Sequence, residues 1–240
     1  MVADQNRGDA YWDEAGAKGY GSAMYRSTDV ESHVRGRCWR EAIDIANTLG
    51  GPTDGHVLDL GCGDGAFANQ VLSTRYRSVE GLDKSEASIQ RAQGEARGLT
   101  IFRAVDLVTL NYDALPRYDA AFLIGILHHI KAATPHVVEA LAQRTNRMVV
   151  LEPNGNNLVR KILEFTPSYR AAGEDSFRTE ELLTIFEKAG WKISVRRQMN
   201  IFPNFTPTSI YQRLRRFEPM VEASQFWNAL CTVGLYGLTN

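Results

Sequence analysis

A glycine-rich turn flanked by carboxylates is the segment of this sequence best suited to bind a small ligand. Residues 58–70 read LDLGCGDGAFANQ, which predicts a strand, a tight turn and then a helix. The turn formally satisfies the G-x-G-x-x-G/A pattern of dinucleotide sites, so an NAD site is one alternative. Asp59 and Asp64 oppose that alternative, because their carboxylates would lie close to the negative charge of a pyrophosphate. A ligand that carries a cationic amine and a sulfonium would be attracted instead.

Two further carboxylates follow the next two predicted strands. Asp83 lies 20 residues after Gly63, and a carboxylate there can accept hydrogen bonds from both hydroxyls of a ribose. Asp106 could accept from the exocyclic amine of an adenine, while the backbone of Leu107 reaches a ring nitrogen. Because ligands of open parallel sheets bind at the carboxyl ends of the strands, these groups are expected to share one site with the glycine turn.

Alternating strands and helices position these side chains. Helical patterns cover residues 20–49 and 65–73, a stretch capped by Ser85, and stretches that begin at Thr134 and Thr179. The predicted strands are residues 56–60, 78–82, 99–105, 118–127, 147–151, 191–197 and 230–238. This alternation predicts an α/β fold, a doubly wound, mostly parallel sheet with helices on both faces and an antiparallel strand at its end.

Composition narrows the class of protein. The chain has 240 residues, 44% of them hydrophobic, and a net charge of −1, which gives no electrostatic case for nucleic acid or an acidic membrane surface. Its three cysteines lie far apart and in no metal spacing, which indicates reduced thiols in a cytoplasmic protein and no metal centre. A polar N-terminus and the lack of a long apolar run argue against a secretory signal and a membrane helix.

The predicted organisation is a small helical region followed by one core domain. Residues 1–52 are expected to form an N-terminal helical lid, and residues 53–240 the ligand-binding core. An aromatic-rich insertion at residues 199–228 could line an apolar pocket or could simply pack on the sheet.

In these motifs the sequence resembles the class I S-adenosylmethionine-dependent methyltransferases. The matching stretches, in the order of that family, are VLDLGCGDG, VEGLDKSEASIQRAQ, AVDLVTL, YDAAFLIGILHHI, MVVLEPNG and the later FRTEELLTIFEKAGW. The resemblance covers most of the chain from residue 55. It implies a Rossmann-like, seven-stranded sheet whose last strand is antiparallel, with S-adenosylmethionine as the methyl donor.

The resemblance also assigns cofactor contacts to residues of this sequence. Asp83 would bind the ribose, Asp106 with Leu107 the adenine, and Asp59 the amino group through water or backbone. The glycines of the turn, together with Ile124 and Gly125, would border the methionine part. Tyr25 of the lid could donate a hydrogen bond to the methionine carboxylate or could simply pack. The complete expected cofactor-binding set is Asp59, Gly61, Cys62, Gly63, Asp83, Lys84, Asp106, Leu107, Ile124, Gly125 and Tyr25.

Three side chains are candidates for catalysis. Methyl transfer from a sulfonium needs alignment and exclusion of water, so a general base need not exist. His128 and His129 follow the fourth strand, where His129 could face the methyl group, or the pair could be a structural part of the loop. Glu152 ends the fifth strand and could bind the acceptor or anchor the loop through backbone N–H groups.

The sequence therefore predicts a methyltransferase that acts on an oxygen, nitrogen or carbon atom of a small-molecule metabolite, and a metabolite of specialised biosynthesis is the first expectation. Its expected partner is that acceptor, with no membrane partner and no nucleic acid. Three alternatives stay open: a protein or RNA methyltransferase, a non-catalytic cofactor-binding subunit, and an NAD(P)-dependent oxidoreductase.

Overall fold

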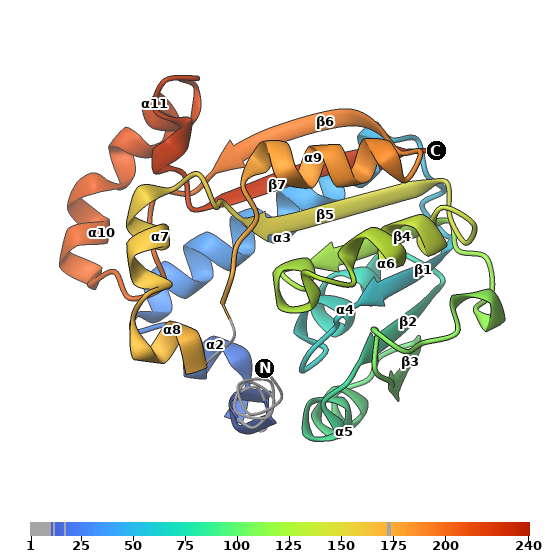
Figure 1. The fold of residues 1–240 in the computed structure, drawn as a ribbon. Helices are drawn as coiled ribbons and strands as arrows, with labels where there is room; N and C mark the ends of the chain where they lie inside the picture. Colours follow the sequence, from blue (N-terminus) through green and yellow to red (C-terminus); the bar gives the residue numbers. More distant parts are fainter. Residues whose placement is uncertain (1–10, 12, 17, 172–173) are drawn as a thin grey trace.

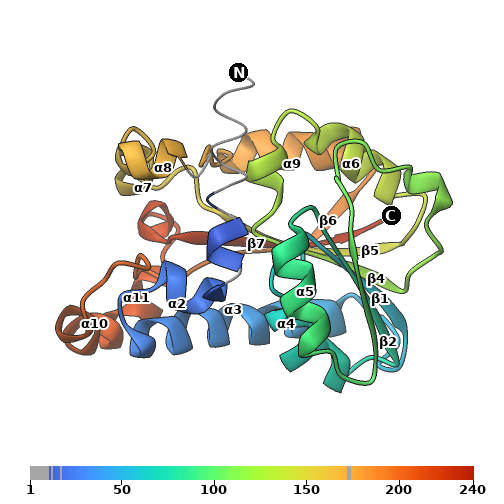
Figure 2. The same ribbon diagram turned by 90° about the horizontal axis from the view of Figure 1, so that it is seen from below.

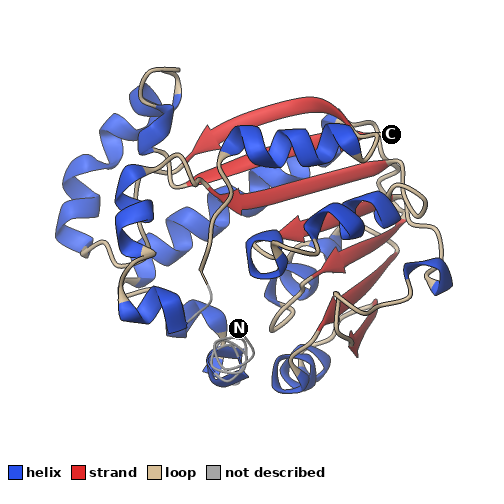
Figure 3. Ribbon diagram, in the orientation of Figure 1, coloured by secondary structure: helices blue, strands red, loops and turns tan. Residues whose placement is uncertain are grey.

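Seven strands form one sheet in the computed structural model, which describes residues 11, 13–16, 18–171 and 174–240 (Figures 1 and 3). The strands are β1 (His56–Leu60), β2 (Ser78–Asp83), β3 (Leu99–Ala104), β4 (Ala120–Ile124), β5 (Arg147–Pro153), β6 (Lys192–Met199) and β7 (Val233–Thr239). Their order is β3-β2-β1-β4-β5-β7-β6, and β7 runs antiparallel to both of its neighbours. The remaining pairs are parallel. The predicted fold class, including the antiparallel last strand, is confirmed.

Helices cover both faces of the sheet (Figure 2). One face carries α3 (Thr28–Thr48), α4 (Ala66–Gln70) and α5 (Glu86–Gly94), and the other carries α6 (Thr134–Leu141) and α9 (Thr179–Lys188). The shorter helices are α2 (Tyr20–Met24), α7 (Leu158–Leu163), α8 (Pro167–Ala171), α10 (Thr208–Leu214) and α11 (Glu218–Glu222). None of the helices in the described part of the chain is long and apolar enough to span a bilayer.

Two hydrophobic clusters, one on each face, fix the sheet between the helices. Ile45 of α3 and Phe67 of α4 pack with Phe122 of β4 in the first cluster. Leu141 of α6 and Phe186 of α9 pack with other sheet residues in the second. Because successive strand residues point to opposite faces, a strand buried on both faces supplies both clusters, and β4 is buried along its length as its apolar sequence predicts.

The N-terminal region is mostly helical, as predicted, but consists of two helices. Residues 20–49 are interrupted at Tyr25, which is extended, and a new helix begins after Ser27. The Ser27 hydroxyl accepts a hydrogen bond from the Val30 N–H at 3.4 Å and so caps α3. This break lets α2 leave the line of α3 and lie against the glycine turn. Residues 1–10 of the predicted lid lie outside the described residues.

Candidate functional site

The glycine turn after β1 is built from left-handed backbone that only glycine adopts readily. Gly61, Gly63 and Gly65 have φ angles of 75°, 53° and 72°. An added Cβ would lie 2.4 Å from Ile126 at Gly61 and 2.3 Å from the Tyr20 ring at Gly63. The turn therefore needs glycine both for its conformation and for the close approach of its neighbours.

Asp83, at the end of β2, holds the turn from the side. Its carboxylate accepts hydrogen bonds from the Gly63 N–H at 2.9 Å and from the Ser85 N–H at 3.0 Å. Burial raises the pKa of Asp83, while these backbone hydrogen bonds and Lys84 act in the opposite direction. Asp83 thus shapes the turn as well as lining the pocket described below.

Asp59, at the end of β1, is a buried carboxylate that lacks a full set of partners. Its side chain is 1% exposed, and Oδ2 has no hydrogen-bond partner among the described residues. Burial, then the charges of Asp83 and Asp64, raise the pKa of Asp59 to about 8. An uncompensated buried carboxylate beside two others attracts a cationic group, so the site fits the amine of S-adenosylmethionine and disfavours a pyrophosphate.

The end of β3 supplies the residues expected to meet an adenine. Asp106 is exposed, and its carboxylate accepts a hydrogen bond from the Val108 N–H at 2.9 Å. Leu107 beside it is buried, and its carbonyl accepts a hydrogen bond from the Tyr112 hydroxyl. The turn after β3 is thereby fixed with the Asp106 side chain at the edge of the pocket.

A single pocket of about 1460 Å³ gathers nearly all of the predicted site residues. All eleven residues of the expected cofactor set line it, and so do His128 and His129. Glu152 is not part of its lining. Three strand ends that are far apart in sequence therefore meet in one cavity, as the rule for parallel sheets predicts.

The N-terminal segment closes over the glycine turn. The Tyr20 N–H donates a hydrogen bond to Asp64 Oδ2 at 2.9 Å, and the Tyr20 hydroxyl lies 3.1 Å from Ser88 Oγ on α5. Ser85 donates to the carboxylate of Asp13. The sequence did not indicate these contacts, because no local pattern links α2 to side chains more than 40 residues away.

Gly63→Ala is expected to loosen this closure. The substitution forces alanine into left-handed backbone, at roughly 1–2 kcal/mol, and drives its Cβ into the Tyr20 ring. We expect a lower melting temperature and faster proteolysis near residues 20–25. Gly94→Ala is the matched control, because an added Cβ there meets nothing within 4 Å. Equal proteolysis of the two variants would show that the Tyr20 contact does not order the segment.

The loop after β4 carries the two histidines and is anchored by Glu152. Glu152 is 1% exposed and accepts hydrogen bonds from the Leu127 N–H at 2.8 Å and the His128 N–H at 3.2 Å. His128 Nδ1 lies 2.7 Å from Glu152 Oε2. The geometry thus favours the anchoring alternative for Glu152 over direct contact with an acceptor, because both of its oxygens are used within the loop.

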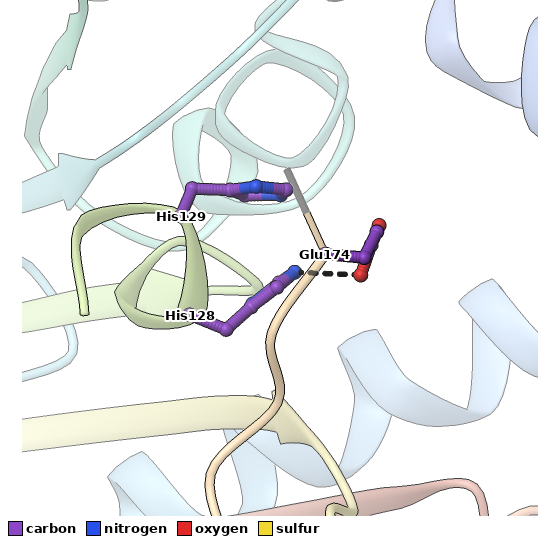
Figure 4. Close-up of side chains that lie close together, drawn as sticks. All are labelled: His128, His129 and Glu174. Carbon is purple, nitrogen blue, oxygen red and sulfur yellow. Dashed lines mark ion pairs between the residues drawn. The ribbon is translucent and has the colours of Figure 1, made fainter. Parts of the chain in front are cut away.

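Glu174, which the sequence did not single out, completes this cluster from the segment before α9 (Figure 4). Its Oε2 lies 3.3 Å from His128 Nε2 and also receives a hydrogen bond from Arg160. Although burial lowers it, Glu152 and Glu174 together raise the pKa of His128 to about 9. Burial and the neighbouring His128 lower the pKa of His129 well below its ordinary value.

The aromatic insertion contributes only part of its side chains to the pocket. Phe202 and Phe205 line it, whereas Phe217, Phe226 and Trp227 are exposed to solvent outside its lining. Tyr211 is buried against Phe202, with ring centroids 5.2 Å apart. The insertion thus contributes Phe202 and Phe205 to the pocket lining, while Tyr211 packs inside the protein.

Comparison with known proteins identifies relatives of the core. Residues 58–156 match a family model described as "Methyltransferase domain". A ubiquinone biosynthesis O-methyltransferase of Alkalilimnicola ehrlichii is 28% identical over 117 residues, which are 47% of this chain and 47% of that protein. A tRNA U34 carboxymethyltransferase of Shewanella baltica is 30% identical over 100 residues, which are 40% of this chain and 30% of that protein. The match thus spans about half or less of these curated relatives.

Solved structures extend the likeness to the whole chain. The crystal structure of magnesium protoporphyrin IX methyltransferase from Synechocystis PCC 6803, with bound S-adenosylmethionine, has a TM-score of 0.61 and 16% identity. The alignment covers 99% of this chain and 97% of that one. At this identity the likeness shows a shared fold, which includes the elements outside residues 58–156.

Proposed function

Because residues 58–156 form a class I S-adenosylmethionine-dependent methyltransferase domain, we propose that this chain methylates an oxygen, nitrogen or carbon atom of a small-molecule metabolite. S-Adenosylmethionine is the cofactor of this domain. The observation that carries the proposal is the single large pocket, which continues from the cofactor-binding residues to an apolar wall. A largely apolar pocket of this size suits a small acceptor better than a polymer.

Two segments supply the apolar wall of this pocket. Phe202, Phe205 and Val221 come from the insertion, and Val159 and Leu163 come from α7. None of these side chains carries charge, so the acceptor should present a hydrophobic body to this wall. The net charge of −1 gives no overall electrostatic attraction to a polynucleotide.

The residues of the site bind and align the reactants. Asp83 would receive the ribose hydroxyls, Asp106 and Leu107 the adenine, and Asp59 the amine. When bound, the cofactor supplies an electrophilic methyl group on a sulfonium. The N-terminal lid, residues 1–52, would exclude water through the contacts of Tyr20, and alignment in a dry site is the main catalytic contribution.

The direct test offers the purified chain a methyl donor with a labelled methyl group and a fractionated metabolite extract. We expect cofactor-dependent label in a small-molecule fraction. Binding of S-adenosylhomocysteine without transfer to any fraction would favour the alternative of a non-catalytic cofactor-binding subunit. The NAD(P) alternative is not supported, because the matched domain is that of a methyltransferase.

A second candidate function is modification of tRNA, favoured by the likeness to proteins named tRNA U34 carboxymethyltransferase. Total tRNA is therefore included as a separate acceptor in the same assay. Label in tRNA and not in metabolites would replace the small-molecule proposal. A cytoplasmic location and a biosynthetic role also belong to the proposal, supported by three free, buried cysteines and by the relative in ubiquinone biosynthesis.

His129→Ala is expected to lower turnover more than cofactor affinity. His129 lines the same pocket as the cofactor-binding residues and the apolar wall, so we propose that it contacts the acceptor. A loss of about 10²-fold or more in kcat, with little change in S-adenosylhomocysteine binding, is the expected pattern. His136→Ala, on the exposed side of α6, is the control. If His128→Ala shows that pattern and His129→Ala does not, the choice between the two histidines is wrong.

A further inference from the structure

We propose that His128, His129 and Glu174 form a binding site for a divalent transition-metal ion in the acceptor half of the pocket. The inference rests on the proposed function and specifies how His129 contacts the acceptor. Two imidazoles and one carboxylate are a ligand set that suits ions such as Zn²⁺, Co²⁺ or Fe²⁺. The potential ligand atoms of the three residues all lie within 4.8 Å of one another.

The distance between two of the three ligands, His128 and Glu174, agrees with coordination. Metal–ligand bonds of about 2.0–2.2 Å in tetrahedral geometry place neighbouring ligand atoms roughly 3.3–3.5 Å apart. His128 Nε2 and Glu174 Oε2 are 3.3 Å apart, and Figure 4 shows the side chains of His128 and Glu174 pointing toward one another. A cation would take the place of the proton between these two atoms, and that proton would leave to solvent.

Glu152 supplies an independent observation, because it fixes the other nitrogen of the His128 ring. With Nδ1 held 2.7 Å from Glu152 Oε2, Nε2 is the atom that remains to face the cluster. Metal-binding histidines commonly have a carboxylate in this position, where it sets the tautomer and the orientation of the ring. The anchored loop after β4 therefore presents His128 in the orientation that a ligand requires.

The charges around the cluster permit a cation despite the guanidinium of Arg160. Arg160 donates a hydrogen bond to Glu174, but its Nε also lies 3.4 Å from Glu164. The carboxylate of Glu164 therefore balances part of the positive charge of Arg160. Both contacts of Glu174 with His128 and Arg160 fall on Oε2, which leaves Oε1 as a second carboxylate oxygen for a metal.

The position of the cluster connects it to the acceptor. All three residues line the pocket, so a site with three protein ligands would keep an open coordination position toward the cavity. An acceptor with an oxygen or nitrogen donor beside the methylated atom would be oriented by that position. The spacing of the sequence did not predict the site, because Glu174 follows His129 by 45 residues and reaches it only through the segment before α9.

The test is metal binding by the full chain without a histidine tag. The protein is stripped with a chelator and titrated with Co²⁺, followed by visible absorption and calorimetry. We expect one Co²⁺ per chain and at least about tenfold weaker binding in His129→Ala and in Glu174→Gln, with His136→Ala unchanged. Circular dichroism and S-adenosylhomocysteine binding of each variant identify those that remain folded. Absent binding, or equal binding by the folded Glu174→Gln variant, would overturn the proposal.

Failure of this inference can be told from failure of the proposed function. If the stripped protein binds no Co²⁺ but still transfers methyl groups, the metal site is disproved and the methyltransferase function stands. Specific Co²⁺ binding without methyl transfer to any acceptor would support the metal site and contradict the proposed reaction.

Discussion

The Asp83→Ala variant is expected to bind S-adenosylhomocysteine about 10- to 100-fold more weakly than the unaltered chain. That range corresponds to roughly 1–3 kcal/mol, the magnitude associated with losing hydrogen bonds to a charged group. Two losses contribute. The carboxylate proposed to receive the ribose hydroxyls is removed, and the N–H groups of Gly63 and Ser85 lose the acceptor that fixes them.

A second substitution separates these two contributions. Asp83→Asn keeps one side-chain oxygen for a backbone N–H, so the turn should be better preserved while one acceptor for the ribose is lost. We expect its affinity to fall between those of the unaltered chain and Asp83→Ala, as measured by isothermal titration calorimetry. Asp44→Ala, at an exposed position of α3, is the control. Affinity of Asp83→Ala equal to that of the control would remove Asp83 from the cofactor site.

Much of the fold could be predicted because its signals are local. The limits of β1 match the sequence prediction residue for residue, since an apolar run ends there at a glycine turn. The carboxylates at the ends of β1, β2 and β3 meet in one pocket because parallel strands bring their carboxyl ends to the same edge. The mostly helical pattern of residues 20–49 did not locate the break between α2 and α3, where Tyr25 is extended and Ser27 caps the helix that follows.

The interactions that decide chemical roles could not be predicted, because they join residues distant in sequence. Glu152 had two interpretations, and its contacts with the backbone of Leu127 and His128 favour one of them. The position of Glu174 beside His128 depends on the path of the segment between α8 and α9. Neither the composition nor a motif reveals this contact, because no sequence pattern contains both Glu174 and His128.

Asp59→Asn is expected to act in opposite directions on stability and on cofactor binding. The Asp59 carboxyl has a pKa of about 8 in the folded chain, against an ordinary value near 3.9. Between about pH 4 and pH 8 the folded protein therefore keeps a proton that the unfolded chain releases, so the free energy of unfolding falls as pH rises through this window. Asparagine does not titrate, so the free energy of unfolding of the variant does not fall with pH for this reason.

At pH 8 the ligand-free variant should accordingly be more stable, by roughly 1–3 kcal/mol, the usual penalty for a buried group left unsatisfied. For a chain of this size that corresponds to a rise in melting temperature of about 2–10 °C. Toward pH 4 the difference should shrink, because Asp59 then becomes protonated in the unfolded as well as in the folded chain. Equal differences at both pH values would show that the stabilisation does not come from the charge of Asp59.

Cofactor binding should change in the other direction. The carboxylate of Asp59 is the buried charge that a cationic amine would neutralise, so its loss should weaken binding about tenfold or more near pH 8. In the unaltered chain affinity should rise with pH up to about 8, because binding the amine requires Asp59 to lose its proton. Calorimetric titrations with S-adenosylhomocysteine from pH 6 to pH 8 measure this rise, and the variant should show a smaller one. A variant that binds as tightly as the unaltered chain at pH 8 would mean that Asp59 does not face the amine, and that its buried charge serves the folded chain in another way.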